Sequence, residues 1–263
     1  MLVLGLLIGA VLGLTGAGGG MLAVPALMFG QGWSVAEAAP AALLAVAAGA
    51  WLGTLDGLRH GLARYRAALL MAAGGLPFGA LGLMLAGRLS PDALQATFAV
   101  FMLVAAVRLL RGGREALAEH DQALCRVHAD TGRLVWTPLT ITVMTALGAL
   151  AGLLSGLLGV GGGFVLVPLL ARYTELSLAA VVATSLMVVA LTASLGAALA
   201  VLHGSMPPAS AVLPFTAAVL AGMWGGRRLS ARLRPAVVMR AFAMLLLAVA
   251  LAMLASRLPG FGV

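Results

Sequence analysis

The sequence contains no lysine, a single cysteine and few charged residues of either sign. Only 9% of its 263 residues are charged, whereas 62% are hydrophobic. A chain of this composition has too little polar surface to coat a soluble globule, so it is expected to be an integral membrane protein. Cys125 has no second cysteine with which to form a disulfide, and the redox compartment is therefore undetermined. The first thirty residues contain no basic region, and we expect no cleaved signal peptide.

Apolar runs of membrane-spanning length recur along the chain. A run of about 20 apolar residues crosses a hydrocarbon layer of ~30 Å, and abundant alanine and leucine favour helices over the alternating strands of a barrel. The sequence therefore predicts an all-α membrane protein, a polytopic helical bundle. The expected spans cover residues 36–55, 67–87, 92–110, 177–202, 209–226 and 235–257.

The chain is an internal duplication. The stretch GLTGAGGGMLAVPALM at 13–28 returns as GLLGVGGGFVLVPLLA at 156–171, an offset of 143 residues. At the same offset the pair His-Gly recurs, and with small gaps the tripeptide LPF at 76–78 meets LPF at 213–215. Each half is therefore expected to hold about four segments, of which the first is interrupted by glycines. The boundaries expected from the repeat are 1–110 for the first membrane repeat, 111–137 for a polar linker on the cytoplasmic side, and 138–258 for the second membrane repeat.

The arginines distinguish two membrane topologies. If both glycine-rich segments crossed the membrane, the arginines would divide almost evenly between the two faces. If residues 138–171 instead enter the membrane and return to the same face, only Arg88 and Arg257 oppose the other arginines, as the positive-inside rule requires. A re-entrant hairpin plus three spans crosses an odd number of times, so we expect the second repeat to be inverted relative to the first. Residues 138–158 alone are long enough to cross, which leaves a plain eight-span arrangement as the alternative.

The first run of three glycines interrupts a segment whose two pieces are too short to cross the membrane alone. About twelve residues precede the first break and about nine follow it, or ~18 Å and ~14 Å of helix. The break is therefore expected near the middle of the membrane. Unpaired backbone groups there cost several kcal/mol each unless they are buried in protein or line a wet cavity. A helix that begins at such a break directs free N–H groups and the positive end of its dipole into it, which favours an anion. Inverted repeats would bring both breaks to one small anion.

Glycine also allows helices to pack closely. This second interpretation suits Gly5, Gly9 and Gly13, which recur every four residues. It accounts less well for two runs of three glycines, each followed by a proline five residues later.

The paired GAGGGMLAVP and GVGGGFVLVP segments, the hydrophobic segments around them and the central polar linker resemble the TauE/SafE family of membrane transporters, also called sulfite exporters. The resemblance covers nearly the whole chain. It implies transport of a sulfur-containing anion, such as sulfite, sulfoacetate or another organosulfonate, across the bacterial inner membrane.

The residues expected to bind the anion are glycines of the two breaks and hydroxyls near them. They are Thr15, Gly18, Gly19, Gly20, Ser155, Gly161, Gly162, Gly163, Thr184 and Ser185. Serine and threonine in membrane helices more often bond a carbonyl one turn back or a neighbouring helix. Thr184 and Ser185 align with alanines in the first half, so any contact that their hydroxyls make with an anion has no counterpart in the other half.

Three titratable residues are candidates for coupling or gating. His60 and His203 are equivalent in the two halves, and histidine titrates near pH ~6.5, although interfacial capping is the simpler explanation. Asp56 lies one turn before His60 and is expected to pair with Arg59, with binding of a coupling cation as the alternative.

The sequence predicts a secondary transporter that works by alternating access. No nucleotide-binding loop is present, so an ion gradient or the gradient of the substrate must drive transport. An anion channel, or a transporter of a different small anion, is the alternative. No paired carboxylates or catalytic triad lie in the expected spans, so we expect no enzymatic activity.

The expected partners follow from this function. They are the small anionic substrate, the lipid bilayer, and protons or another coupling ion; a homodimer is compatible with the sequence. We expect no nucleic acid and no cofactor. We also expect no metal, because His120, Cys125 and His128 in the linker lack a fourth ligand.

Overall fold

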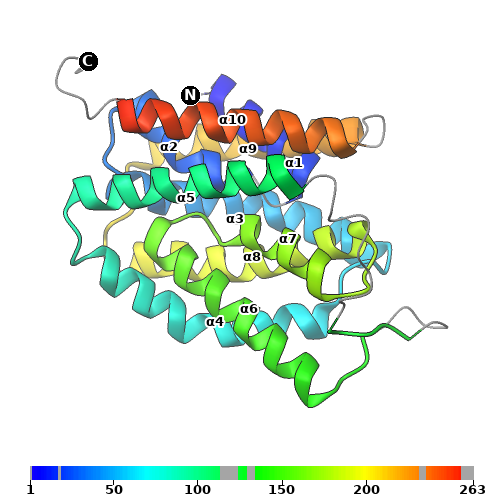
Figure 1. The fold of residues 1–263 in the computed structure, drawn as a ribbon. Helices are drawn as coiled ribbons and strands as arrows, with labels where there is room; N and C mark the ends of the chain where they lie inside the picture. The colour runs from blue at the N-terminus through cyan, green and yellow to red at the C-terminus, as the bar shows by residue number, and fades with distance from the viewer. Residues whose placement is uncertain (1, 17–18, 113–123, 129–133, 231–234, 256–263) are drawn as a thin grey trace.

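The computed structural model describes residues 2–16, 19–112, 124–128, 134–230 and 235–255. In these ranges the chain folds into ten α-helices, with no strand longer than an isolated bridge (Figure 1). The helices are α1 (Leu2–Thr15), α2 (Gly19–Gln31), α3 (Val35–Arg59), α4 (Tyr65–Ala86), α5 (Pro91–Gly112), α6 (Pro138–Leu158), α7 (Gly163–Tyr173), α8 (Leu178–Leu202), α9 (Ala209–Ser230) and α10 (Pro235–Ala255). The all-α fold is confirmed, and the six expected spans coincide with α3, α4, α5, α8, α9 and α10.

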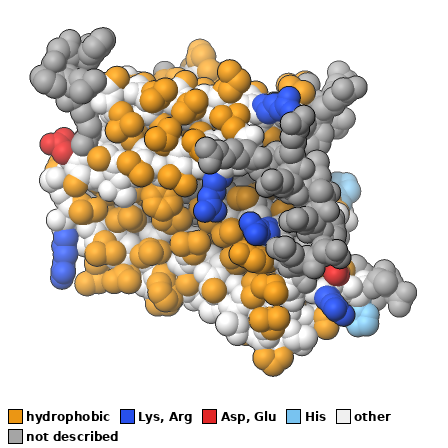
Figure 2. All heavy atoms as spheres, viewed as in Figure 1, with side chains coloured by type: hydrophobic (Ala, Val, Ile, Leu, Met, Phe, Trp, Pro, Cys, Tyr) orange, Lys and Arg blue, Asp and Glu red, His pale blue; other side chains and the backbone are white. Residues whose placement is uncertain are grey.

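Seven of these helices are long and apolar enough to cross a membrane: the six expected spans and α6. The other three are shorter, with 14 residues in α1, 13 in α2 and 11 in α7. Hydrophobic side chains are spread over much of the face shown in Figure 2, as expected of a surface in contact with lipid. The chain is therefore a multi-pass membrane protein.

α3 and α8 have matching boundaries. The side chain of Ser34 accepts a hydrogen bond from the backbone N–H of Glu37 at the start of α3, and Ser177 caps Ala180 in the same way at the start of α8. Such caps satisfy backbone donors that a helix start leaves unpaired. Each helix ends before the histidine of a His-Gly pair. Both starts and both ends are 143 residues apart, which is the offset of the sequence repeat.

α3 and α8 pack against each other in opposite directions near the middle of the bundle (Figure 1). A β-carbon on Gly53 of α3 would lie 2.6 Å from Leu186, whereas one on Gly196 of α8 would lie 2.9 Å from Leu43. Along the shared interface, residue numbers therefore increase in α3 in the same direction in which they decrease in α8. These two equivalent helices therefore run antiparallel.

The first helix of each half packs against a helix of the other half. α1 lies on α9, and α6 lies on α4. A β-carbon on Gly9 of α1 would lie only 2.8 Å from the backbone nitrogen of Met223. The four-residue spacing of glycines in α1 therefore serves close helix packing, as the second interpretation of these glycines predicts.

The packing register shows which residues of α4 and α9 are equivalent. A β-carbon on Gly13 of α1 would lie 2.8 Å from the backbone nitrogen of Arg227, and one on the equivalent Gly156 of α6 would lie 3.0 Å from that of Leu83. Residues 83 and 227 differ by 144. The match of the two LPF tripeptides implies an offset of 137 and is therefore wrong by seven residues, or about two helical turns.

Residues 124–128, which lie between α5 and α6 in the sequence, are bonded to the end of α7 and the residues that follow it. The backbone N–H of Cys125 donates to the carbonyl oxygen of Tyr173 at 3.0 Å, and that of Glu175 donates to the carbonyl oxygen of Cys125 at 3.3 Å. The N–H of Val127 donates to the carboxylate of Glu175 at 2.9 Å. These bonds fix residues 124–128 beside the end of α7.

Candidate functional site

Each glycine break is a sharp corner between two helices. Gly16 follows α1 with a φ of +79°, and Gly159 follows α6 with a φ of +69°. Glycine adopts this left-handed conformation without the steric cost that a β-carbon imposes. The N–H of Gly16 donates to the carbonyl oxygen of Leu12 at 2.9 Å, and that of Gly159 donates to the carbonyl oxygen of Ser155 at 2.8 Å. The two corners therefore begin in the same way, with a left-handed glycine that bonds back to the last turn of its helix.

After each corner the chain turns back and packs against the helix that it has left. A β-carbon on Gly19 would lie 2.7 Å from the carbonyl oxygen of Ile8, and the equivalent Gly162 faces the carbonyl oxygen of Ala151. Close backbone packing alone therefore requires glycine at these two positions, whether or not a ligand binds. Gly18 belongs to the same run but lies outside the described residues.

The two corners meet between α3 and α8. A β-carbon on Gly20 would lie 2.5 Å from the carbonyl oxygen of Val160 and 3.3 Å from Val46. One on Gly161 would lie 3.1 Å from Val189 and 3.6 Å from Val46. Val46 is the twelfth of the 25 residues of α3, and Val189 is the twelfth of the 25 residues of α8. The corners therefore lie beside the midpoints of two helices of membrane-spanning length.

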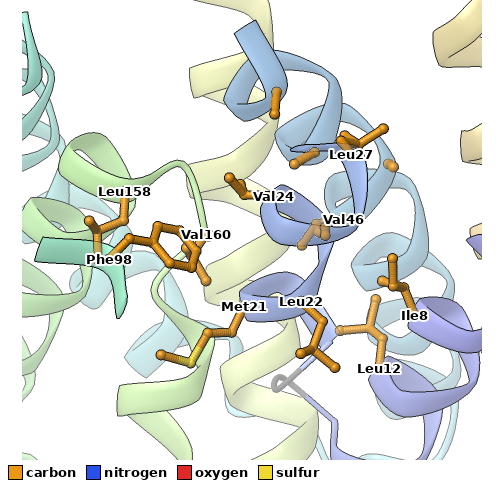
Figure 3. Packing of buried hydrophobic residues seen from close by; sticks show 14 of the residues in the cluster. Ile8, Leu12, Met21, Leu22, Val24, Leu27, Val46, Phe98, Leu158 and Val160 are labelled. Carbon is orange, nitrogen blue, oxygen red and sulfur yellow. The ribbon is translucent and has the colours of Figure 1, made fainter. Parts of the chain in front are cut away.

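Buried apolar side chains surround the meeting point. Figure 3 shows Val24, Val46 and Val160 in one cluster, with Met21 and Leu22 on the first turn of α2. All five side chains are buried. Electrostatic interactions are stronger in such surroundings than in water, because the effective dielectric constant is lower.

α7 begins at the second corner without a side-chain cap. Its N-cap residue is Gly162, which has no side chain to accept hydrogen bonds from the first turn. Gly163, the first residue of the helix, is buried. The N–H groups and the positive dipole end of this helix are therefore directed into the protein at the corner.

Ser185 has an unpaired hydroxyl close to both corners. The residue is fully buried on α8, and its Oγ has no hydrogen-bond partner in the described part of the chain. Ser185 lies one turn from Val182, which meets Gly16, and one turn from Val189, which meets Gly161. It therefore lies on the side of α8 that passes the two corners.

The other predicted hydroxyls have different surroundings. Thr15 donates to the carbonyl oxygen of Val11 at 2.8 Å. Thr184 accepts a hydrogen bond from the backbone N–H of Arg64 at 3.0 Å and so connects the start of α4 to α8. Ser155 is buried one turn before the second corner. The two threonines thus satisfy backbone groups, as hydroxyls in membrane helices commonly do.

A cavity of about 850 Å³ extends from the charged end of α3 to the first corner. Thr15 borders it beside the corner, and among the described residues its charged lining consists of Asp56, Arg59, Arg227 and Arg228. Three arginines against one aspartate give the lining a positive balance. Such a cavity attracts anions.

Asp56 pairs with Arg227 of α9. Oδ2 of Asp56 contacts Nη2 of Arg227, and Nη1 of Arg227 donates to the carbonyl oxygen of Gly53 at 3.4 Å. Nδ1 of His60 lies 3.4 Å from Oδ1 of Asp56. The expected pairing with Arg59 is therefore wrong, because α9 rather than the next turn of α3 brings a guanidinium to the carboxylate.

The two predicted histidines lie exposed at the ends of α3 and α8. Nδ1 of His60 is 2.8 Å from the carbonyl oxygen of Asp56, and Nδ1 of His203 is 3.1 Å from that of Leu199. Both are capping contacts with the last helical turn. A role of either residue in coupling or gating stays a prediction.

Sequence reasoning missed three residues of the cavity. They are Trp224, Arg227 and Arg228, and the guanidinium of Arg228 lies over the Trp224 ring at 3.6 Å from its centroid. In the sequence they follow the pattern of an ordinary span end, where tryptophan and arginine mark the membrane surface. Only the packing of α9 against α1 and α3 turns this end toward a cavity.

Metal-ligating side chains do not gather in the described parts of the chain. No group of three or more histidine, cysteine, aspartate or glutamate residues could hold a metal ion there. His120, one of the three linker residues considered above, lies outside the described residues.

Known proteins resemble the chain over most of its length. A family model described as "Sulfite exporter TauE/SafE" matches residues 1–253. The "Probable membrane transporter protein YunE" of Bacillus subtilis (strain 168) is 25% identical over 240 residues, which cover 88% of this chain and 86% of that protein. A "Probable membrane transporter protein" of Xylella fastidiosa (strain 9a5c) is 29% identical over 185 residues, which cover 70% of this chain and 66% of that protein. No solved structure matches the chain at a significant level.

Proposed function

Because the chain belongs to the sulfite exporter TauE/SafE family of membrane transporters, we propose that it is a secondary transporter of a small sulfur-containing anion. Sulfite, sulfoacetate or another organosulfonate is the proposed substrate, and the bacterial inner membrane is the proposed location. The observation that carries the proposal is the meeting of two glycine corners beside the midpoints of α3 and α8. The proposed function includes no enzymatic reaction.

The corners offer backbone donors at a depth where a charged side chain would be costly. α2 and α7 begin there, so the first N–H groups and the positive dipole ends of two helices adjoin the same region. A dipole end stabilises a nearby anion by about 0.3–1 kcal/mol when exposed and by up to ~2 kcal/mol when partly buried. The unpaired hydroxyl of Ser185 adds a donor. The proposed anion ligands are backbone groups at Gly19, Gly20, Gly161, Gly162 and Gly163 together with the Ser185 hydroxyl.

Alternating access by two inverted repeats is the proposed mechanism. Its support is the antiparallel packing of the equivalent helices α3 and α8. In Figure 1 the equivalent helices α5 and α10 also run in opposite directions along the bundle. The corners belong to different repeats, so a movement of one repeat against the other would change which end of the protein reaches the anion. The cavity beside the first corner is the proposed access route from the arginine-rich end.

An anion channel and a transporter of a different small anion are the alternatives. A channel would use the same backbone donors as a selectivity filter. The positive lining of the cavity favours anions over cations but does not distinguish one small anion from another.

A ligand screen with a matched pair of serine variants tests the proposed site. The folded protein in detergent is heated with sulfite, sulfate, thiosulfate, sulfoacetate or taurine, and the shift in unfolding temperature is measured. An anion at about a hundred times its Kd stabilises the folded state by ~2.7 kcal/mol. We expect Ser185→Ala to lose most of this stabilisation. We expect Ser194→Ala to keep it, because the Ser194 hydroxyl of α8 already accepts a hydrogen bond from the indole N–H of Trp51 in α3.

The variants also separate a binding role from a structural role. Removing an unpaired buried hydroxyl should leave the protein without ligand as stable as the wild type, or slightly more stable. An unchanged anion shift in Ser185→Ala contradicts the role of this residue, and the absence of any anion shift in the wild type contradicts the anion site. Uptake against a concentration gradient in proteoliposomes distinguishes a transporter from a channel.

A further inference from the structure

Asp56 and Arg227 form an ion pair at the charged end of the cavity, between α3 of the first half and α9 of the second. The side chain of Asp56 is 44% exposed and that of Arg227 is 31% exposed. Ion pairs with this exposure contribute little to stability, because water already solvates both partners. A competing anion can therefore displace the carboxylate at small cost.

The pair has no charged equivalent in the other half of the chain. Leu199 occupies the position equivalent to Asp56, and Leu83 occupies the position equivalent to Arg227. The ion pair is therefore present at one end of the helix bundle, and the equivalent positions in the other half hold two leucines. It lies at the end where the cavity is lined by arginines.

Arg227 also lies close to the first corner. Its backbone nitrogen packs against Gly13 in the last turn of α1, and this helix ends at Thr15, which borders the same cavity. A guanidinium presents its N–H donors in a planar fork that matches two oxygens of an oxyanion as well as those of a carboxylate. In this fork Nη2 contacts the carboxylate of Asp56, and Nη1 donates to the carbonyl oxygen of Gly53 at 3.4 Å.

We propose that Arg227 binds the transported anion between the charged end of the cavity and the corners, and that Asp56 is a built-in counter-charge which the anion displaces. The inference rests on the proposed transport function. The ligand class is a small oxyanion whose sulfite or sulfonate oxygens take the place of the Asp56 carboxylate on the guanidinium. Arg59 and Arg228 line the same cavity and raise the local anion concentration.

Titration of purified variants in detergent tests this exchange. Sulfite, thiosulfate and sulfoacetate are each titrated into the wild type, Asp56→Asn, Arg227→Gln and the double variant, and Kd is measured by calorimetry. Removing the competing carboxylate should lower Kd by about threefold or more, since the anion no longer displaces a partner. Removing the guanidinium should raise Kd by about tenfold or more, because charge-assisted hydrogen bonds are lost. The double variant should match Arg227→Gln, because Asp56 acts only through Arg227.

Arg59→Gln is the matched control, since it removes one positive charge from the same cavity lining. Its Kd should change by less than about threefold, and the change should disappear at high salt. If Asp56→Asn does not fold, the comparison of Arg227→Gln with Arg59→Gln still decides whether Arg227 binds the anion.

The outcomes distinguish this inference from the proposed function. Wild-type Kd values in both Asp56→Asn and Arg227→Gln, with only a lower unfolding temperature, would show that the pair merely joins α3 to α9 and would overturn the inference alone. Equal losses of affinity in Arg227→Gln and Arg59→Gln would overturn it as well. A wild-type protein that binds none of the three anions would overturn the proposed function together with the inference.

Discussion

The indole N–H of Trp51 donates a hydrogen bond to the hydroxyl of Ser194 at 3.0 Å, and the two residues occupy equivalent positions in the two repeats. Two equivalent residues can contact each other only near the axis that relates their repeats. In the proposed arrangement of inverted repeats, the hydrogen bond therefore places this axis between α3 and α8. Because these helices are antiparallel, the axis runs across them rather than along them, which is the geometry expected of inverted repeats.

Cysteines introduced at two equivalent helix ends test the inversion. His60 and His203 are exposed and follow α3 and α8 at an offset of 143 residues. In a Cys125→Ala background, we expect His60→Cys to react with an impermeant maleimide from the cytoplasmic side only and His203→Cys from the opposite side only. Labelling in intact and permeabilised cells measures this. Reaction of both cysteines from the same side would contradict inverted repeats.

Gly20→Ala should separate the two corners. The added β-carbon would lie 2.5 Å from the carbonyl oxygen of Val160, which belongs to the backbone and so cannot move aside as the end of a flexible side chain can. Overpacking of this kind typically costs about 1–3 kcal/mol, which thermal unfolding in detergent can measure.

Gly225→Ala is the control for this glycine substitution. Gly225 also lies within a helix, but a β-carbon there would meet nothing within 4 Å. We expect unchanged or slightly higher stability, since alanine favours helix over glycine by about 1 kcal/mol. Equal stability of the two variants would contradict the close contact between the corners.

Thr184→Val should weaken the fold without weakening anion binding. Valine has nearly the shape of threonine but cannot accept the hydrogen bond from the backbone N–H of Arg64. A donor left without its partner costs about 1–3 kcal/mol, to be measured as a lower unfolding temperature. Thr184→Ser keeps the hydroxyl, so its unfolding temperature should fall less. A reduced anion-induced stabilisation in Thr184→Val, but not in Thr184→Ser, would instead place this hydroxyl in the binding site.

Cys125 should react slowly with alkylating reagents in the folded protein. Burial raises the pKa of its thiol, an effect that a hydrogen bond with Thr140 only partly offsets. A raised pKa leaves less of the reactive thiolate at a given pH, so labelling at about pH 7.5 should be slow and should accelerate as the pH rises. Glu175→Gln weakens the attachment of residues 124–128 and should speed labelling. Equally fast labelling of folded and unfolded protein would contradict the buried position.

Local signals explain how much of the fold could be predicted. Apolar runs of spanning length predict α3, α4, α5, α8, α9 and α10, because lipid requires every backbone group of a span to be bonded within its own helix. The repeated glycine-rich stretches predict both corners, since left-handed backbone such as that at Gly159 and Gly162 favours glycine. The length of residues 138–158 indicates that α6 alone reaches a spanning length, which the structure confirms.

The candidate site was predicted only in part. Glycines of the two runs were expected to come together, and Gly20 and Gly161 do lie at the meeting point. The sequence did not distinguish Ser185 from its neighbour Thr184, because two adjacent hydroxyls on a helix point in different directions and only their neighbours decide their roles. Asp56 was assigned the nearest arginine in the sequence rather than the nearest one in space.

The sequence by itself determined the class of the protein, the position of its spans, the repeat and the two breaks. These features depend on composition, on hydrophobic runs and on glycine, all of which act over a few turns of chain. Only the tertiary structure decided that α1 packs on α9 and α6 on α4, that the equivalence of α4 and α9 follows an offset of 144, and that Arg227 faces Asp56. Such contacts join residues more than fifty positions apart, and they are set by how small side chains let helices approach rather than by any local pattern.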